Sequence, residues 1–295
     1  METVLKGKGK KVVIADGRPT VILGERINPT GKKKLAAALV AGDMEVVRRE
    51  ALGQVAAGAD ILDVNVGAAG VDEVDLLPRA VRLVMETADV PVAIDTADGQ
   101  ALAAALAAHK ELNPDGKPLV NSVNGEEASM KRVLPLVAEY GTAVIGLAMD
   151  DDGIPPTAEG RLAVAAKIVE RAGKLGIPPE NILIDCLALT VGADSQAGWI
   201  TLEAIRLVKE KLGVNLALGA SNVSFGLPER EIINGAFLAM AIARGLNCPI
   251  VDAAKVRPYI LAADLALGRD DYAMRYLKGY RQRQKLAPGG AGPIG

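Results

Sequence analysis

The sequence predicts an α/β fold of the (β/α)8 TIM-barrel type, in which eight parallel strands alternate with helices around a closed ring. One observation is that short aliphatic runs alternate with longer helical patterns over most of the 295-residue chain. Another is that these runs are continuously apolar, which is typical of parallel strands covered by helices. A third is that half of the residues are apolar but only 3% are aromatic, so small aliphatic side chains must fill the core.

Eight short apolar runs are the expected strands. They comprise residues 21–23, 61–64, 92–94, 119–120, 143–145, 182–184, 216–218 and 250–251. The expected helix N-caps are Asp43, Asp98, Asn124 and Thr157. Pro228 suits a first helical position. A doubly wound sheet uses the same alternation, but it usually carries a glycine-rich phosphate turn after an early strand, and none is present.

No linker interrupts the alternation, so we expect a single domain over residues 1–295. The barrel should cover about residues 20–257, and one or two further helices should follow as an extension over residues 258–283. Residues 288–295 consist mainly of Gly and Pro and are expected to form a flexible tail.

Charge and cysteine content exclude several classes of protein. The 34 Lys and Arg against 36 Asp and Glu give a net charge of −2, which argues against nucleic acid or a membrane surface as partner. Cys186 and Cys248 cannot form a disulfide framework, and no apolar run is long enough to span a bilayer, so a cytoplasmic location is expected. Residues 1–11 are too polar for a secretory signal. The single histidine, His109, is interpreted as a surface or helix-end residue, and no metal site is expected.

Polar side chains end nearly every expected strand, and in such barrels the active site lies at these carboxyl ends. They are Glu25, Arg26 and Asn28; Asp63 and Asn65; Asp95; Asn121; Asp185; Ser221 and Asn222; and Asp252. The set is poor in Lys and His, unlike a phosphate site or a hydrolase site with a nucleophile and a base. Asp and Asn instead suit the edge of a flat heterocycle rich in N–H donors, because a carboxylate can accept two parallel hydrogen bonds.

Asp and Asn also form turns and cap helices, so each of them could have a structural role instead. For Asp98 and Asn124 the capping interpretation is favoured. Asp95, Asn121 and Asp185 fall directly at strand ends, with later residues available as caps, and there the binding-site interpretation is favoured.

The strand-end segments, taken in order, resemble those of a known family. They are Gly24-Glu-Arg-Ile-Asn28, Leu62-Asp-Val-Asn-Val-Gly67, Ile94-Asp-Thr96, Asn121-Ser-Val-Asn124, Ile145-Gly-Leu-Ala-Met-Asp150, Leu183-Ile-Asp185, Leu218-Gly-Ala-Ser-Asn-Val-Ser224, Phe237-Leu-Ala-Met-Ala-Ile-Ala-Arg-Gly245 and Val251-Asp252. Over about residues 22–265 the chain is similar to the methyltetrahydrofolate:corrinoid protein methyltransferases. These belong to the pterin-binding superfamily, with the folate module of cobalamin-dependent methionine synthase and dihydropteroate synthase.

The resemblance implies a barrel that binds 5-methyltetrahydrofolate or tetrahydrofolate as substrate in a polar cup at its C-terminal face. It implies that Asp95, Asn121 and Asp185 hold the pterin edge, and that Asn222 lies near the methyl-bearing nitrogen-5 as the catalytic residue. The further candidates are Glu25, Asn28, Asp63, Asn65, Gly219, Ser221, Phe225 and Asp252. An amide oxygen at Asn222 can accept a hydrogen bond from protonated nitrogen-5 and strengthen as charge develops there.

The resemblance also implies a transient partner, a corrinoid protein that carries the cobalamin, and a homodimeric assembly. The chain itself lacks the Asp-x-His-x-x-Gly segment that binds a corrinoid through a lower-ligand histidine, because His109 is followed by Lys110-Glu-Leu112. The cobalt that exchanges the methyl group is therefore expected on the partner.

Two other functions stay open, a dihydropteroate synthase-like enzyme and a non-catalytic folate-binding subunit. Dihydropteroate synthases carry a Ser-Arg-Lys run and a late Arg-x-His, where this chain has Ser221-Asn-Val223 and Arg257-Pro-Tyr259. Phe225 stands where acetogenic members of the resembled family are expected to have a polar residue, and it either contacts the substrate or packs. Lys32–Lys34 either meets the polyglutamate tail of folate or forms a solvated loop.

Overall fold

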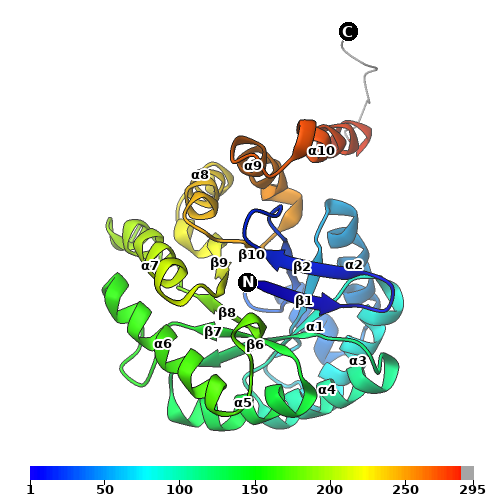
Figure 1. Ribbon diagram of the computed structural model, residues 1–295. Helices are drawn as coiled ribbons and strands as arrows, with labels where there is room; N and C mark the ends of the chain where they lie inside the picture. Colours follow the sequence, from blue (N-terminus) through cyan, green and yellow to red (C-terminus); the bar gives the residue numbers. More distant parts are fainter. Residues whose placement is uncertain (287–295) are drawn as a thin grey trace.

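The computed structural model, which describes residues 1–286, is a closed barrel of eight parallel strands surrounded by helices, as the sequence predicts (Figure 1). The barrel strands are β3 (Leu23–Ile27), β4 (Ile61–Val64), β5 (Val92–Asp95), β6 (Leu119–Asn124), β7 (Ala143–Leu147), β8 (Ile182–Asp185), β9 (Asn215–Gly219) and β10 (Cys248–Val251). β3 pairs with both β4 and β10, which closes the ring. Seven of the expected runs lie inside these strands, whereas the first run ends at Leu23, where β3 begins.

The described chain also contains ten α-helices, most of which form an outer ring around the barrel. They are α1 (Lys33–Val40), α2 (Glu45–Ala57), α3 (Glu73–Thr87), α4 (Gly99–Leu112), α5 (Glu127–Tyr140), α6 (Ala158–Lys174), α7 (Ala197–Leu212), α8 (Arg230–Ala243), α9 (Ala253–Ala266) and α10 (Met274–Leu286), with short 3-10 helices η1 (Pro179–Asn181), η2 (Ala220–Ser224) and η3 (Asp271–Ala273). No helix among residues 1–286 is both long and apolar enough to cross a membrane.

The C-terminal extension is α10, which packs on the outside of α9 (Figure 1). α9 follows the last barrel strand and completes the ring of helices. Pro258, where the sequence places the start of the extension, therefore lies inside a barrel helix. The tail expected at residues 288–295 lies outside the described residues.

A hairpin at the start of the chain, which the sequence did not predict, covers the amino ends of the barrel strands. β1 (Glu2–Lys6) pairs antiparallel with β2 (Lys11–Ala15), and Figure 1 shows the pair across the centre of the barrel. The buried hydroxyl of Thr3 donates a hydrogen bond to the carbonyl of Glu180 and accepts one from the side chain of Asn215. Buried positions alternate with less buried ones along most of both strands, but Thr3 is polar and the intervening Val4 and Val13 are apolar, so the sequence does not show this alternation.

Small aliphatic side chains fill two layers of core, as the composition predicts. The inner layer contains Leu23, Ile61, Leu119, Ile145, Leu183, Ala217 and Ile250 of the barrel, with Leu5, Val12 and Ile14 of the hairpin. The outer layer lies between strands and helices. Phe237 is the one aromatic side chain among the buried apolar residues of the described chain. Both cysteines are buried, and burial raises the pKa of each thiol, so neither is a reactive thiolate at neutral pH.

Two of the four predicted N-caps are confirmed, whereas Met44 and not Asp43 is the N-cap of α2. Asp98 and Thr157 cap α4 and α6 through their side chains, and Asp43 accepts a hydrogen bond from the first turn of α2. Asn124 is instead the last residue of β6, and its side chain accepts a hydrogen bond in the turn before α5. Pro228 lies two residues before α8 and is not a first helical residue. In both cases the loop that leaves the strand is longer than the sequence indicates.

The expectation of a surface position for His109 is wrong. The residue lies in the last turn of α4, as expected for a helix end, but it is only 2% exposed. The following turn covers it, since a Cβ at Gly116 would lie 2.6 Å from the imidazole Cε1. Burial, together with the charge of Lys110, lowers the pKa of His109 to about 4, so the ring is neutral at pH 7.

Candidate active site

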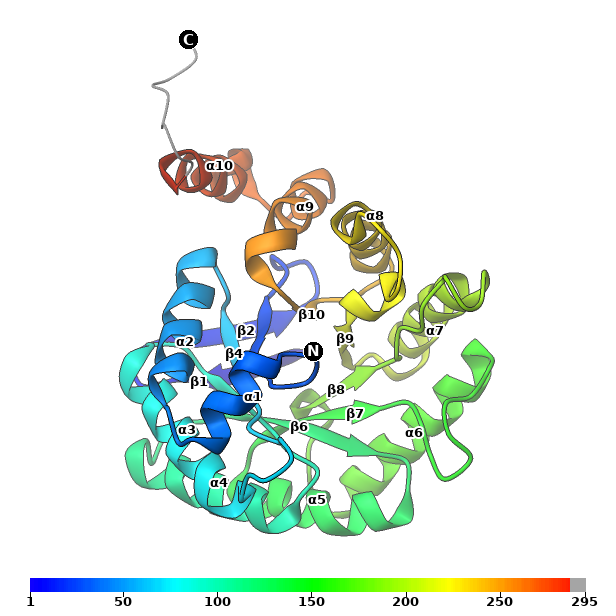
Figure 2. The same ribbon diagram turned by 180° about the vertical axis from the view of Figure 1, so that it is seen from behind.

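The carboxyl ends of the eight parallel strands meet at one face of the barrel, opposite the hairpin (Figure 2). The register of the sheet places Asp63 beside Ala93 and Asp95 beside Asn121. Polar side chains that are distant in the sequence therefore converge at this face, as predicted.

Asp63 and Asp95 form a carboxyl pair on neighbouring strands. Asp63 is 2% exposed and accepts a hydrogen bond from Asn121, whose Nδ2 lies 3.1 Å from Oδ1. Asp95 accepts one from Asn28, whose Nδ2 lies 3.4 Å from Oδ2. Burial raises the pKa of both groups, and the charge of Asp95 raises that of Asp63 further. The pKa of Asp63 is therefore raised further than that of Asp95, so Asp95 is the member of the pair that ionises first.

Asp185 ends β8 and is held by two backbone donors. The nitrogen of Leu187 lies 2.7 Å from Oδ1, and that of Gly219 lies 3.0 Å from Oδ2. Burial raises the pKa of Asp185 to about 6, although both hydrogen bonds favour the ionised form. A Cβ at Gly219 would lie 4.0 Å from Asp185 Oδ2 and 3.5 Å from Asn222 Nδ2. The carboxylate and the amide thus flank the same glycine.

Asn222 lies in η2 and is exposed at the mouth of the barrel. Its neighbour Ser221 donates a hydrogen bond to Glu25 on β3, with 3.0 Å between Oγ and Oε1. Burial raises the pKa of Glu25. Arg230 anchors η2 by donating to the carbonyl of Ser221, and its guanidinium lies 5.9 Å from the centre of the Phe225 ring.

A cavity of about 480 Å³ opens between β3, η2 and the end of β10, a size typical of small-molecule sites. Six residues predicted from the sequence line it: Glu25, Asn28, Ser221, Asn222, Phe225 and Asp252. Four cations share its wall: Arg26, Lys32, Arg230 and Lys255. Asp95, Asn121 and Asp185 do not line this cavity. Asn28 connects it to Asp95 through a hydrogen bond, and Gly219 separates Asn222 from Asp185.

Three predicted residues have evident contacts within the protein. Asp252 caps α9, and its carboxylate lies 3.6 Å from the guanidinium of Arg26. Asn65 shapes the loop after β4 by accepting a hydrogen bond from the N–H two residues on, at 2.8 Å. Lys32 donates to two backbone carbonyls at β3, and burial lowers the pKa of its ammonium group. Lys32 is therefore tethered at the cavity and is not free in solvent.

Three cations near the strand ends escaped the sequence interpretation. Arg230 and Lys255 follow no motif, and only the folded chain brings them to the cavity. The sequence does contain a signal for Arg161 of α6. This residue falls on the apolar face of its helix, three residues after Ala158 and four before Ala165. A charged residue at such a position is buried, and the structure shows it only 1% exposed.

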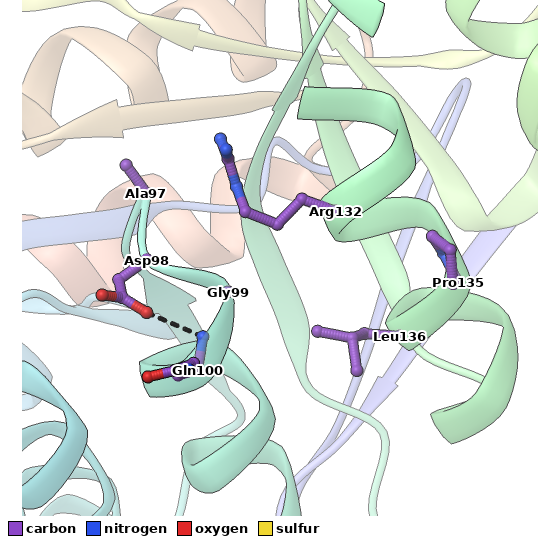
Figure 3. Close-up of a pocket in the computed structure, with 7 residues that line it drawn as sticks. All are labelled: Ala97, Asp98, Gly99, Gln100, Arg132, Pro135 and Leu136. Carbon is purple, nitrogen blue, oxygen red and sulfur yellow. Dashed lines mark hydrogen bonds between the residues drawn. The ribbon is translucent and has the colours of Figure 1, made fainter. Parts of the chain in front are cut away.

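A second hollow, of about 600 Å³, lies between the start of α4 and the side of α5 (Figure 3). Asp98 caps α4 there, with a hydrogen bond to Gln100, and Arg132, Pro135 and Leu136 form the opposite wall. This hollow contains none of the residues that converge at the strand ends. The polar chemistry of the molecule therefore indicates the barrel mouth as the site.

Comparison with known proteins identifies the family to which the chain is similar. Residues 24–252 match the family of pterin binding enzymes. The chain is 31% identical over 277 residues to the methylcorrinoid:tetrahydrofolate methyltransferase of Eubacterium limosum, a match that covers 91% of this chain and 98% of that protein. It is 32% identical over 261 residues to the methionine synthase of Mycobacterium tuberculosis, a match that covers 84% of this chain but only 21% of that larger protein.

Solved structures of dihydropteroate synthases share the fold. The enzyme of Yersinia pestis with a pterine-sulfa conjugate gives a TM-score of 0.68 at 17% identity, covering 90% of this chain and 99% of that one. The enzyme of Stenotrophomonas maltophilia with bound imidazole gives 0.67 at 20% identity, covering 92% and 99%. At such low identity the likeness shows the barrel fold alone.

Proposed function

Because the chain belongs to the family of pterin binding enzymes, we propose that it moves a methyl group between nitrogen-5 of tetrahydrofolate and the cobalt of a separate corrinoid protein. Tetrahydrofolate and 5-methyltetrahydrofolate are the substrates, and the partner carries the cobalamin. The Eubacterium limosum relative, which the chain matches over nearly its whole length, is a methylcorrinoid:tetrahydrofolate methyltransferase.

The observation that carries the proposal is the convergence of carboxylates and an amide at the barrel mouth. The amino-pyrimidinone edge of a pterin presents adjacent N–H donors, which need ionised acceptors. Asp95 ionises more readily than Asp63, and Asp185 retains free lone pairs after accepting two backbone hydrogen bonds. Asn121 both donates and accepts, so these three side chains hold the ring by its edge.

Asn222 supports the positive charge that protonation places on nitrogen-5 before the methyl group leaves. In transfer toward cobalt, the nitrogen–methyl bond breaks, its electron pair returns to nitrogen-5, and the methyl group passes to the reduced cobalt. Nitrogen-5 leaves as a neutral amine only when it is protonated, and the amide oxygen of Asn222 accepts the hydrogen bond from that N–H. The exposure of Asn222 on the cavity wall, next to Gly219 and Asp185, is consistent with this role.

The remaining cavity accommodates the rest of the folate and leaves the mouth accessible to the partner. Phe225 is 68% exposed at the cavity and offers a ring face to the aryl group of the substrate. Lys32 and Lys255 provide positive charge for the glutamate tail. The corrinoid protein docks transiently over this face, because it must leave to meet its second methyltransferase. We expect a homodimer, which light scattering checks.

A dihydropteroate synthase activity receives no support from the side chains. Val223 stands where such synthases carry Lys, and it is buried. Arg257, which opens the Arg-Pro-Tyr segment, donates to Gln282 of α10 at 3.1 Å. An assay of aminobenzoate incorporation into pteroate should be negative.

The deciding experiment mixes the purified protein with 5-methyltetrahydrofolate and a reduced corrinoid protein and follows the cobalt absorption spectrum. We expect methylcobalt to form at a rate proportional to enzyme concentration, with no change when the folate is omitted. Folate binding without methylcobalt formation on any corrinoid protein tested would indicate a non-catalytic folate-binding subunit. Absence of both binding and transfer would reject a folate site.

A further inference from the structure

Arg161 is a buried cation that the methyl-transfer chemistry does not use. It lies in the first turn of α6 and is 1% exposed. A positive charge is disfavoured at a helix N-terminus because the helix dipole is positive there. No carboxylate of the described chain forms a salt bridge with it. Its position therefore requires compensation from other groups.

Backbone carbonyls of the loop after β8 provide that compensation. The Nη1 atom of Arg161 lies 2.9 Å from the carbonyl oxygen of Cys186 and 2.7 Å from that of Leu187. It also lies 3.1 Å from the hydroxyl of Thr201 on α7, whose single proton is within reach of the carbonyls of Leu187 and Ala197. The Nε atom donates to the carbonyl of Pro155. The guanidinium thus joins α6, α7 and the β8 loop.

Leu187 is the residue that this cluster fixes. Its φ is 61°, a left-handed conformation that leucine rarely adopts. In this conformation its N–H donates to Asp185, with 2.7 Å between the nitrogen and Oδ1, while its carbonyl faces Arg161 and Thr201. One peptide segment therefore connects the buried cation to the buried carboxylate.

We propose that Arg161 is a positioning residue of the pterin site, which holds the Leu187 backbone so that Asp185 keeps both its direction and its negative charge. This inference rests on the proposed folate site. The charged surroundings of Asp185 are simple: β9 contributes the N–H of Gly219, η2 the neutral Asn222, and α6 the charge of Arg161. The adjacent thiol of Cys186 is neutral, because burial raises its pKa.

The test compares Arg161→Met with the wild type by two measurements at a series of pH values. The first is the titration of the Asp185 carboxyl carbon by NMR in the ligand-free protein. The second is the affinity for 5-methyltetrahydrofolate. The variant loses the positive charge of Arg161 and the fixed orientation of the Leu187 N–H. The pKa of Asp185 should therefore rise from about 6 by about one pH unit. The higher pKa should lower the affinity about twofold at pH 7 and about tenfold below pH 6, and the affinity should recover at higher pH.

Three further variants separate positioning from general stability. Arg161→Lys retains the charge and should restore most of the wild-type pH profile. Thr201→Val retains the charge and removes one hydrogen bond, so it should give a smaller shift. Arg171→Met removes a surface cation of the same helix and should leave both titrations unchanged.

The outcomes are distinguishable. A uniform loss of affinity in Arg161→Met, with the wild-type midpoint for Asp185, would overturn the positioning role and leave Arg161 a purely structural residue. If Arg161→Met shifts the titration of Asp185 but the wild-type protein binds no folate, the coupling between Arg161 and Asp185 is supported and the folate site is rejected. If Arg161→Met does not fold, the Arg161→Lys and Thr201→Val titrations decide, and an unchanged Asp185 midpoint in both overturns the role.

Discussion

The substitution Asp185→Asn removes one buried ionisable group at the barrel mouth, and its effect on the free energy of unfolding measures the cost of burying that carboxylate. Burial raises the pKa of Asp185 from 3.8 to about 6. At pH values below 3.8 the group is protonated in both the folded and the unfolded chain. As the pH rises from 3.8 to about 6, the unfolded chain loses its proton first, so the folded state becomes relatively less stable. Above about 6 the group is ionised in both states and the cost stays constant.

The magnitude follows from the difference between the two pKa values. A difference of about two pH units corresponds to about 3 kcal/mol of unfolding free energy. Asparagine has no charge to desolvate and removes this pH dependence. It also turns an amide NH2 toward either Leu187 or Gly219, each of which donates an N–H to the carboxylate. That mismatch costs about 1–3 kcal/mol at every pH and does not alter the slope.

The assay is urea unfolding of the wild type and of Asp185→Asn at pH values from 4 to 8. The stability of the wild type minus that of the variant should fall by about 2 kcal/mol between pH 4 and pH 6.5 and then level off. The shifts at Glu25, Asp63 and Asp95 are present in both proteins and cancel in the subtraction. A difference that stays constant across this window, or that rises with pH, would refute the assignment of a desolvated carboxyl to Asp185.

Three other perturbations test the site and the fold. Asn222→Ala should slow methyl transfer about 10²-fold in single-turnover measurements and weaken folate binding less than tenfold. Equal decreases in transfer rate and folate affinity would mean that Asn222 only holds the ring. Lys32→Met should weaken the binding of a polyglutamylated folate about threefold more than the binding of the monoglutamate. Lys34→Met on α1 is the matched control and should affect neither. Equal effects of Lys32→Met on both ligands would show that Lys32 does not bind the glutamate tail. Asn215→Ala should lower the free energy of unfolding by about 3 kcal/mol, because it removes three buried hydrogen bonds, to Thr3, Ile14 and Asn247, beneath the barrel. A urea midpoint equal to that of the wild type would contradict this role of Asn215.

The positions of residues that directly end a strand could be predicted from the sequence. Asp95, Asn121 and Asp185 each come at the end of an apolar run, and parallel topology alone brings such positions to one face. The helix caps Asp98 and Thr157 are equally local, since each depends on a few consecutive residues. The sequence therefore predicted the barrel and the position of these side chains at the carboxyl ends of its strands.

Residues whose role depends on packing between distant elements could not be predicted in this way. Arg230 reaches the cavity only because η2 folds back against the start of α8. His109 is covered by a turn that the helical pattern does not show. The hairpin is stabilised by contacts such as that of Thr3 with Glu180, which lies 177 residues away. In each case the partner has no fixed spacing from the residue it contacts.

The carboxyl groups at the mouth are the strongest physical argument that this face has a function. Burial raises the pKa of Glu25, Asp63, Asp95 and Asp185, so each costs the fold free energy that an aliphatic or amide side chain would not. The barrel does not need them for stability, because its core is aliphatic in both layers. Groups of shifted pKa that gather at one face are typical of binding and catalytic sites. A ligand whose N–H groups donate to these oxygens recovers part of the desolvation cost on binding, which is the chemistry that a pterin edge supplies.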